Sequence, residues 1–166
     1  MVRVDIETIV MAAGPVPSLI VLRERCSKSD SPAPLRSLSI QTGSFEAAAI
    51  SRGIDSGRAD RPITHDLLLD TVDALGAKLE RVEIVRAEPP VFYATVVVLA
   101  DGNEHRIDAR PSDAIALAVR SNAPMFVEDE IMNRLGTVSS HAEEVDDEQE
   151  FEKFDEFVHT LSPDDF

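Results

Sequence analysis

The segment from residue 104 to residue 127 constrains the fold of this chain more than any other part of it. A polar strand ending at Asp108 runs through Arg110 and Pro111 into a helix predicted over residues 111–121. Proline suits the first position of a helix, because the amide hydrogen that it lacks would have no partner there. The six residues from Ala114 to Val119 carry no polar side chain. We therefore expect this helix to be buried on most sides.

Four polar residues crowd the start of this helix, namely Asp108, Arg110, Ser112 and Asp113. Polar groups packed beside a core element are unfavourable unless they satisfy one another or bind a ligand. In a structural interpretation, Arg110 bridges Asp108 and Asp113, and Asp113 interacts with the helix N-terminus. In a catalytic interpretation, Asp108 and Asp113 bind Mg²⁺ or Mn²⁺, while Arg110 and Ser112 bind a phosphate of the substrate.

Two further candidate residues lie upstream, His65 and Glu46. Thr64 is a good N-cap for a helix that runs to Leu75, which places His65 at the mouth of that helix. A histidine there could act as a general base or metal ligand, or it could belong to an ordinary helix start with Asp66 favoured by the dipole. Glu46 is a possible third carboxylate for a metal, or simply an acid in the first turn of a helix predicted over residues 45–50.

Several strings in this chain resemble the motifs of the bifunctional nuclease family. The hallmark segment is Arg-Pro-Ser-Asp-Ala-Ile-Ala-Leu-Ala at 110–118, followed by Ala-Pro-Met-Phe-Val at 123–127. Upstream and in the family's order come Gly-Ser-Phe-Glu-Ala at 43–47 and Arg-Pro-Ile-Thr-His-Asp-Leu-Leu at 61–68. The resemblance covers roughly residues 1–135. Before the helix this chain reads Ile-Gln-Thr-Gly-Ser-Phe-Glu, where members commonly carry Ile-Gly-Pro-Phe-Glu, so the turn differs.

The resemblance implies a compact α+β domain that forms a homodimer and cleaves both RNA and DNA. Taken with the candidate residues, it predicts a nuclease of broad specificity that uses a divalent metal, Mg²⁺ or Mn²⁺. The catalytic residues would be Asp108, Arg110, Asp113 and His65, with Glu46 as a further metal ligand. The alternative is a non-catalytic regulatory or interaction module, in which the same polar cluster only supports the fold.

The charge of the chain bears on this choice, because phosphate binding normally depends on Lys and Arg. The formal net charge is −15. Residues 139–166 hold eleven acids against Lys153, so this tail contributes 1 − 11 = −10 and the rest of the chain carries −5. The chain has no Trp, one Tyr and no basic stripe with interleaved aromatics, which argues against an extended stacking platform for single strands.

The order of predicted elements favours an α+β domain with a mixed, mostly antiparallel sheet. A hairpin is expected from residues 1–11 and 18–25, and a second from 91–99 and 104–109 around Asp101-Gly102. Strands are also expected at 35–41, 77–86 and 125–127, and a short helix at 130–135. The glycine-rich and charged stretch at 51–61 is predicted to be a mobile loop.

We divide the chain into a nuclease-like domain over residues 1–138 and an acidic linker with an amphipathic helix over 139–166. In that tail Phe151, Phe154, Phe157, Val158 and Leu161 recur at helical spacing. The single cysteine, Cys26, excludes an internal disulfide. No signal peptide or apolar span is evident, so we expect a cytoplasmic protein that does not enter the membrane.

Overall fold

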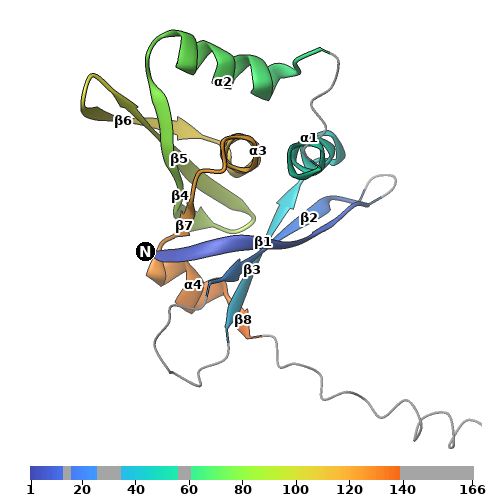
Figure 1. The fold of residues 1–166 in the computed structure, drawn as a ribbon. Coiled ribbons are helices and arrows are strands. Elements are labelled where there is room, and N and C mark those ends of the chain that lie inside the picture. Colours follow the sequence, from blue (N-terminus) through green and yellow to red (C-terminus); the bar gives the residue numbers. More distant parts are fainter. Residues whose placement is uncertain (13–15, 26–34, 56–60, 139–166) are drawn as a thin grey trace, which may run out of the picture.

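The computed structural model describes residues 1–12, 16–25, 35–55 and 61–138, which form one eight-stranded sheet and four helices (Figure 1). The strands are β1 (Val2–Val10), β2 (Ser18–Glu24), β3 (Arg36–Thr42), β4 (Lys78–Glu88), β5 (Val91–Ala100), β6 (Asn103–Ala109), β7 (Met125–Val127) and β8 (Thr137–Val138). The helices are α1 (Ser44–Ile54), α2 (Thr64–Ala74), α3 (Pro111–Ser121) and α4 (Asp129–Leu135).

The strand order in the sheet is β6-β5-β4-β7-β1-β2-β3-β8. Strands β1–β3 and β4–β6 each form an antiparallel meander, and the short strand β7 joins the two. Strand β7 runs antiparallel to β1 and parallel to β4, while the other described pairs are antiparallel. The predicted α+β class with a mixed, mostly antiparallel sheet is therefore confirmed.

The expected turns form where the sequence places glycine. Asp101 and Gly102 have φ values of 50° and 75° between β5 and β6. Positive φ at both central residues is what a type I′ hairpin turn requires, so this predicted hairpin is confirmed. Gly76, with φ of 74°, follows α2 at the position where a left-handed residue ends a helix.

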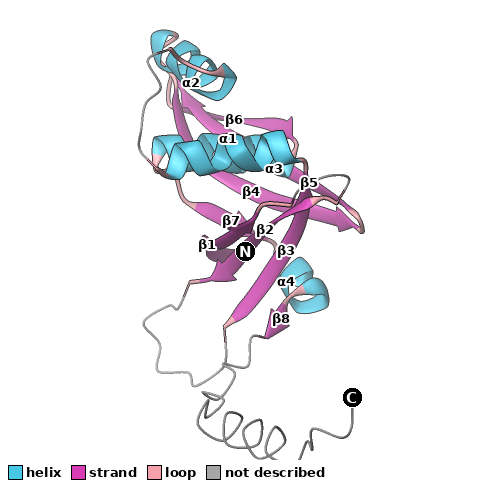
Figure 2. Cartoon of the chain, turned by 90° about the vertical axis from the view of Figure 1, so that its right-hand side faces the viewer, coloured by secondary structure: helices cyan, strands magenta, loops and turns pink. Residues whose placement is uncertain are grey.

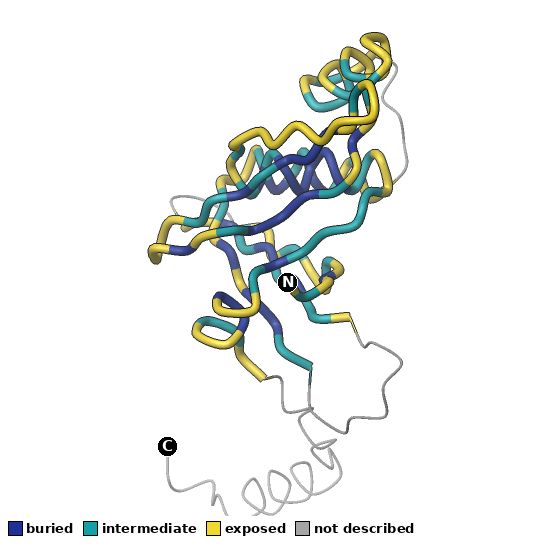
Figure 3. Tube along the Cα trace, turned by 90° about the vertical axis from the view of Figure 1, so that its left-hand side faces the viewer, coloured by how far each residue is buried: buried dark blue, intermediate teal, exposed yellow. Residues whose placement is uncertain are grey.

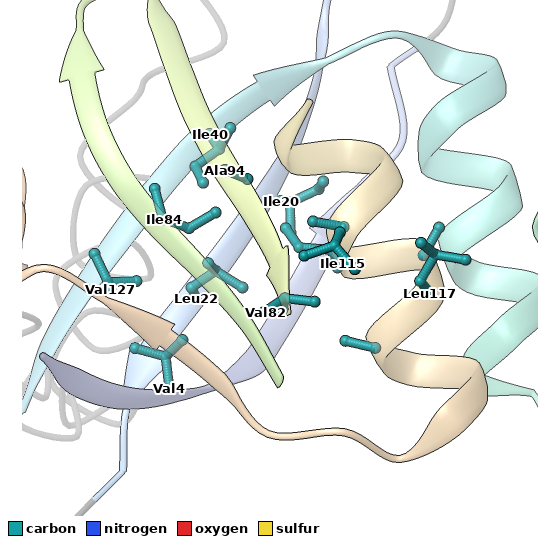
Figure 4. Close-up of a cluster of buried hydrophobic side chains, with 14 of the residues drawn as sticks. Val4, Ile20, Leu22, Ile40, Val82, Ile84, Ala94, Ile115, Leu117 and Val127 are labelled. Carbon is teal, nitrogen blue, oxygen red and sulfur yellow. The ribbon is translucent and has the colours of Figure 1, made fainter. Parts of the chain in front are cut away.

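Helix α3 is the central helix of the fold and packs against α1, β4 and β5 (Figure 2). Its residues Ala114–Ala118 are all buried, as the apolar run predicts. Branched side chains from the strands fill the space beneath it, among them Ile20, Val82 and Ile84, with Ile115 pointing into the same cluster (Figure 4). This packing fixes the N-terminal end of α3 beside the starts of α1 and α2.

Helix α2 lies at the periphery of the fold, as its exposed and half-buried tube in Figure 3 shows. None of its eleven residues is buried. Its inner face is made by Leu69 and Val72, which are partly buried against the core. Leu67 and Leu68 are exposed to solvent. The position of α2 therefore depends on polar contacts as well as on apolar packing.

The structure corrects three local predictions. Helix α1 does not end near residue 50 but continues to Ile54, so the first residues of the predicted loop at 51–61 are helical. Thr64 is the first helical residue and not the N-cap; the cap is Ile63, whose amide donates to Asp66 Oδ2 at 2.9 Å. Strand β8 was not predicted, because two residues carry no periodic signal.

Two predicted features lie outside the described residues: the loop around Cys26 and the amphipathic helix of the acidic tail. Within the part of the chain that is described, no helix is both long and apolar enough to cross a membrane.

Candidate functional site

The first turns of three helices meet at the end of α3 that follows β6. Helix α1 contributes Glu46, α2 contributes His65, and α3 contributes Asp113, with Arg110 as the residue that precedes α3. We call these four residues the Arg110 cluster. Each helix N-terminus carries partial positive charge from its unpaired amide groups. The convergence therefore creates a positive environment in which carboxylates are stabilised.

Arg110 is the centre of this cluster and binds both carboxylates. Its Nε and Nη2 donate to Asp113 Oδ2 and Oδ1 at 2.7 and 3.0 Å, a bidentate arrangement. Its Nη1 donates to Glu46 Oε1 at 3.2 Å. The Arg110 side chain is nevertheless 64% exposed. Three of the five guanidinium N–H groups are thus engaged by carboxylates, which leaves two that can reach a ligand from solvent.

Asp113 is the acceptor that joins Arg110 to His65. The Arg110 guanidinium holds the pKa of the Asp113 carboxyl below its ordinary value of 3.8. His65 Nε2 lies 3.4 Å from Asp113 Oδ1, a long contact by hydrogen-bond standards. The His65 side chain is 16% exposed, and its Nδ1 is buried without a hydrogen-bond partner among the described residues. Nε2 of His65 therefore faces the other residues of the cluster, and Nδ1 is enclosed by the protein.

Glu46 is fitted into the cluster by the glycine that precedes α1. A Cβ added to Gly43 would lie 2.2 Å from Glu46 Oε2, so any larger residue would displace this carboxylate. The Gly-Ser-Phe-Glu string thus has a local physical basis: glycine leaves room for the glutamate three residues later to turn back along the chain. In this position the other oxygen of Glu46 can reach Arg110.

Asp108 does not join the Arg110 cluster. In β6 it pairs with Thr95, while its neighbour Ala109 pairs with Ala94, a buried residue of the core face. Because successive side chains of a strand point to opposite faces, Asp108 lies on the sheet face away from α3. The predicted bridge from Arg110 to Asp108 is accordingly replaced by one from Arg110 to Glu46. Ser112 lies in the first turn of α3 and is buried.

The predicted metal ligands can be tested against this geometry. Asp108 is on the other face of the sheet, and both oxygens of Asp113 accept hydrogen bonds from Arg110. Among the described residues, no group of three or more His, Cys, Asp and Glu side chains is arranged to hold a metal ion. In this arrangement Asp108, Asp113 and Glu46 do not fit a shared Mg²⁺ or Mn²⁺ site.

A second polar group, which the sequence did not single out, holds α2 in place beside the cluster. Arg120, on α3, donates from Nε to Asp66 Oδ1 at 2.9 Å and from Nη2 to the carbonyl oxygen of Ala49 in α1 at 2.8 Å. Asp66 is the residue after His65. The Arg120 side chain is only 8% exposed. The one signal for this bridge in the sequence was that an arginine, Arg120, directly follows the apolar run from Ala114 to Val119.

A large hollow of the described surface lies at the other end of α3. It has a volume of about 1280 Å³ and is lined by residues that include Arg3, Arg52, Asp66, Asp73 and Lys78. Both acidic and basic side chains line its walls, and none of the four residues of the Arg110 cluster does. This groove is therefore separate from the cluster, although Asp66 and His65 are adjacent in the chain.

Comparison with known proteins gives one family and two relatives. The bifunctional nuclease domain family matches residues 28–140 of this chain. Two proteins of Mycobacterium tuberculosis, one from strain CDC 1551 / Oshkosh and one from strain ATCC 25618 / H37Rv, are each 39% identical over 136 residues. The aligned part covers 79% of this chain and 81% of each relative, and both relatives are described as uncharacterized proteins. The matched residues include the whole Arg110 cluster.

Proposed function

Because the chain belongs to the bifunctional nuclease domain family, we propose that it hydrolyses phosphodiester bonds of RNA and DNA at the Arg110 cluster. The observation that carries this proposal is the state of Arg110 itself. Its guanidinium is fixed by two carboxylates and yet remains 64% exposed. A rigid and accessible guanidinium is well suited to bind phosphate through paired hydrogen bonds.

The charge of the cluster also has to suit a polyanion. With His65 neutral, one guanidinium stands against two carboxylates, a formal charge of −1. Each of the three helix N-termini is equivalent to roughly half a positive charge, which together offset that excess. The cluster is therefore close to neutral overall. Arg110 supplies its directed donors for phosphate.

We assign the roles from the positions of the side chains. Arg110 binds a non-bridging phosphate oxygen and stabilises charge on the phosphoryl group as water attacks phosphorus. The bond from phosphorus to the leaving oxygen breaks, the attacking water loses a proton, and the leaving oxygen gains one. His65 is the group that exchanges these protons, through Nε2, once the long 3.4 Å contact of Nε2 with Asp113 Oδ1 opens to admit the phosphate. Asp113 orients Arg110 and keeps His65 at the cluster before the substrate binds, and Glu46 keeps Arg110 in place.

The test uses the purified full chain with end-labelled single-stranded RNA and DNA. Arg110→Gln and His65→Ala should each lower the rate of cleavage by about 10²- to 10³-fold. Asp108→Asn is the matched control, because this carboxylate lies on the opposite face of the sheet and should be dispensable. Melting temperatures must stay close to that of the parent chain. Full activity of both cluster variants, or loss of activity in Asp108→Asn alone, would contradict the assignment.

The divalent metal is a separate proposal, since the predicted ligands do not converge. Cleavage is measured with Mg²⁺, with Mn²⁺ and with a chelator in excess. A strict requirement for one of the ions would support metal assistance, and undiminished cleavage in the chelator would refute it. The non-catalytic alternative makes a different prediction: the chain would bind nucleic acid or protein with no turnover under any of these conditions.

We also propose that the protein acts as a homodimer in the cytoplasm. Helix α2 supports the first part, because none of its residues is buried while Leu67, Leu68 and Leu75 are exposed. A helix of this kind is typical of a surface covered by a partner. Light scattering after size exclusion gives the mass directly, and a monomer at micromolar concentration would contradict the dimer.

A further inference from the structure

Among the described residues, Phe45 is the most exposed large apolar residue, 89% accessible, and it adjoins the Arg110 cluster in the chain. Its neighbour in the chain, Glu46, accepts the hydrogen bond from Arg110. We propose that a single-stranded nucleic acid lies along the outer face of α1, with one base stacked on Phe45 and a phosphate bound at Arg52. This inference rests on the proposed function and specifies the kind of substrate that the site takes.

Helix geometry places Phe45 and Arg52 on one face. The buried face of α1 is formed by Ala47 and Ile50. Successive residues are about 100° apart around the axis of a helix. Phe45 therefore lies about 160° around the axis from Ala47, on the side that faces solvent. Arg52 is seven residues further on, which returns it to within about 20° of Phe45 and places it about 10 Å along the axis. An aromatic ring and a cation therefore share the outer face of α1.

The surface between them is suited to close approach by a ligand. Ala48 and Ala49 are small residues on the turns between Phe45 and Arg52, and neither is fully buried. Arg52 is exposed and forms no ion pair with any of the described residues. Two other arginines near the helices are engaged: Arg110 binds two carboxylates, and Arg120 is buried against Asp66. Arg52 thus offers a free guanidinium at this end of the helix.

A lone exposed apolar residue is ordinary on a protein surface, so exposure alone would not identify a ligand. Phe45 is distinguished by its neighbours: it precedes Glu46, which binds Arg110, and it shares the outer face of α1 with Arg52. In a single strand, each base is flanked by phosphates, and stacking of one base on an aromatic ring is tolerant of sequence. The order Arg110, Phe45, Arg52 matches phosphate, base, phosphate. A duplex would fit less well, because its bases are already stacked and paired.

The sequence argues against an extended platform of aromatics, and a single ring can stack only one base. We therefore expect modest affinity, with stacking as a local contribution next to the cleaved bond. It would help to hold the phosphate against Arg110, and it would favour unpaired regions of RNA and DNA over duplexes.

The experiment measures equilibrium binding of a fluorescent single-stranded oligonucleotide to the full chain by anisotropy, with the oligonucleotide checked for intactness afterwards. Phe45→Ala should weaken binding about 5- to 150-fold, while Phe45→Trp should retain or improve it. Val138→Ala is the matched control, because Val138 is 51% exposed and lies in β8 beside Arg36, at the opposite end of β3 from α1. An oligonucleotide with abasic positions should bind the parent chain and Phe45→Ala alike.

Salt dependence separates the two contacts. For single strands the slope of log K against log salt changes by about 0.7 for each phosphate contact. Arg52→Gln should therefore reduce the slope by about that amount, and Phe45→Ala should lower affinity with the slope unchanged. A smaller slope of log K against log salt in Phe45→Ala would indicate that this variant disturbs phosphate binding and not stacking.

The outcomes distinguish this inference from the function on which it rests. If the parent chain binds and cleaves single strands but Phe45→Ala behaves like Val138→Ala, the stacking inference fails and the proposed function stands. If Phe45→Ala changes the oligomeric state, Phe45 is a subunit contact and the inference is overturned. If the parent chain neither binds nor cleaves single strands, both the stacking inference and the proposed function are refuted.

Discussion

Removal of the buried guanidinium of Arg120 should destabilise this protein more than any surface substitution. The side chain is 8% exposed and donates to Asp66 at 2.9 Å and to the carbonyl oxygens of Ala49 and Ala116, each at 2.8 Å. It thereby connects α1, α2 and α3. Arg120→Met keeps much of the apolar stem but removes the charge and all the donors, which isolates the polar part of the interaction.

The expected loss follows from these contacts. Removing one partner of a buried ion pair destabilises by about 3–5 kcal/mol, because the other partner and its acceptors are left without hydrogen bonds. For a protein of this size, that corresponds to a fall in melting temperature of about 6–20 °C. Urea unfolding followed by circular dichroism gives the free energy of unfolding by linear extrapolation. Arg52→Gln, an exposed arginine on α1, is the control and should change that free energy by less than about 0.5 kcal/mol.

A double-mutant cycle with Asp66 tests the reasoning further. If Arg120 acts through Asp66, then Asp66→Asn and Arg120→Met should not be additive, and their coupling energy should exceed about 0.5 kcal/mol. The account would be refuted if Arg120→Met unfolded with a free energy within about 1 kcal/mol of the parent chain. In that case the guanidinium would contribute little to the position of α2, and His65 would be held by apolar packing alone.

Two further predictions concern other parts of the fold. Gly53→Ala would place a Cβ 2.6 Å from Val119 Cγ2 and 2.7 Å from Arg120 Nη1. The resulting strain should outweigh the gain in helix propensity, so urea unfolding should show a loss of about 1 kcal/mol in the free energy of unfolding. An increase in that free energy would contradict the close approach. Arg36 holds the pKa of the Glu24 carboxyl below its ordinary value of 4.5 through a two-bond ion pair. The carboxylate therefore stabilises the fold above that ordinary value, and this contribution disappears as the pH falls through the lowered pKa. The stability difference between the parent chain and Glu24→Gln should accordingly shrink below about pH 4, and a constant difference from pH 7 to pH 2.5 would contradict it.

Much of the architecture was predictable because its signals are local. The apolar run from Ala114 to Val119 predicts the buried helix, and Asp101-Gly102 predicts the hairpin between β5 and β6. The hairpin of β1 and β2 was likewise predicted, from the strand patterns at residues 1–11 and 18–25. Helix starts were less predictable: Thr64 has the side chain of a cap, but the carboxylate of Asp66 binds the preceding amide and the helix begins after Ile63.

The site was predictable only in part, because its contacts cross the chain. His65 and Asp113 are 48 positions apart and meet only once α2 and α3 are packed together. The sequence grouped Asp108 with Arg110 because they are close in the chain. Strand alternation separates them, since Asp108 faces away from α3, and the sequence alone does not state which face of β6 is covered. Glu46 reaches Arg110 across 64 positions, so the bridge that replaces Asp108 was equally hidden.

The most direct test of the account is the cleavage of single-stranded RNA and DNA by Arg110→Gln, compared with the parent chain and with Asp108→Asn at equal melting temperature. We predict that Arg110→Gln loses at least about 10²-fold in rate while Asp108→Asn cleaves like the parent chain. Cleavage by Arg110→Gln at the parental rate would show that the chemistry occurs elsewhere on this fold.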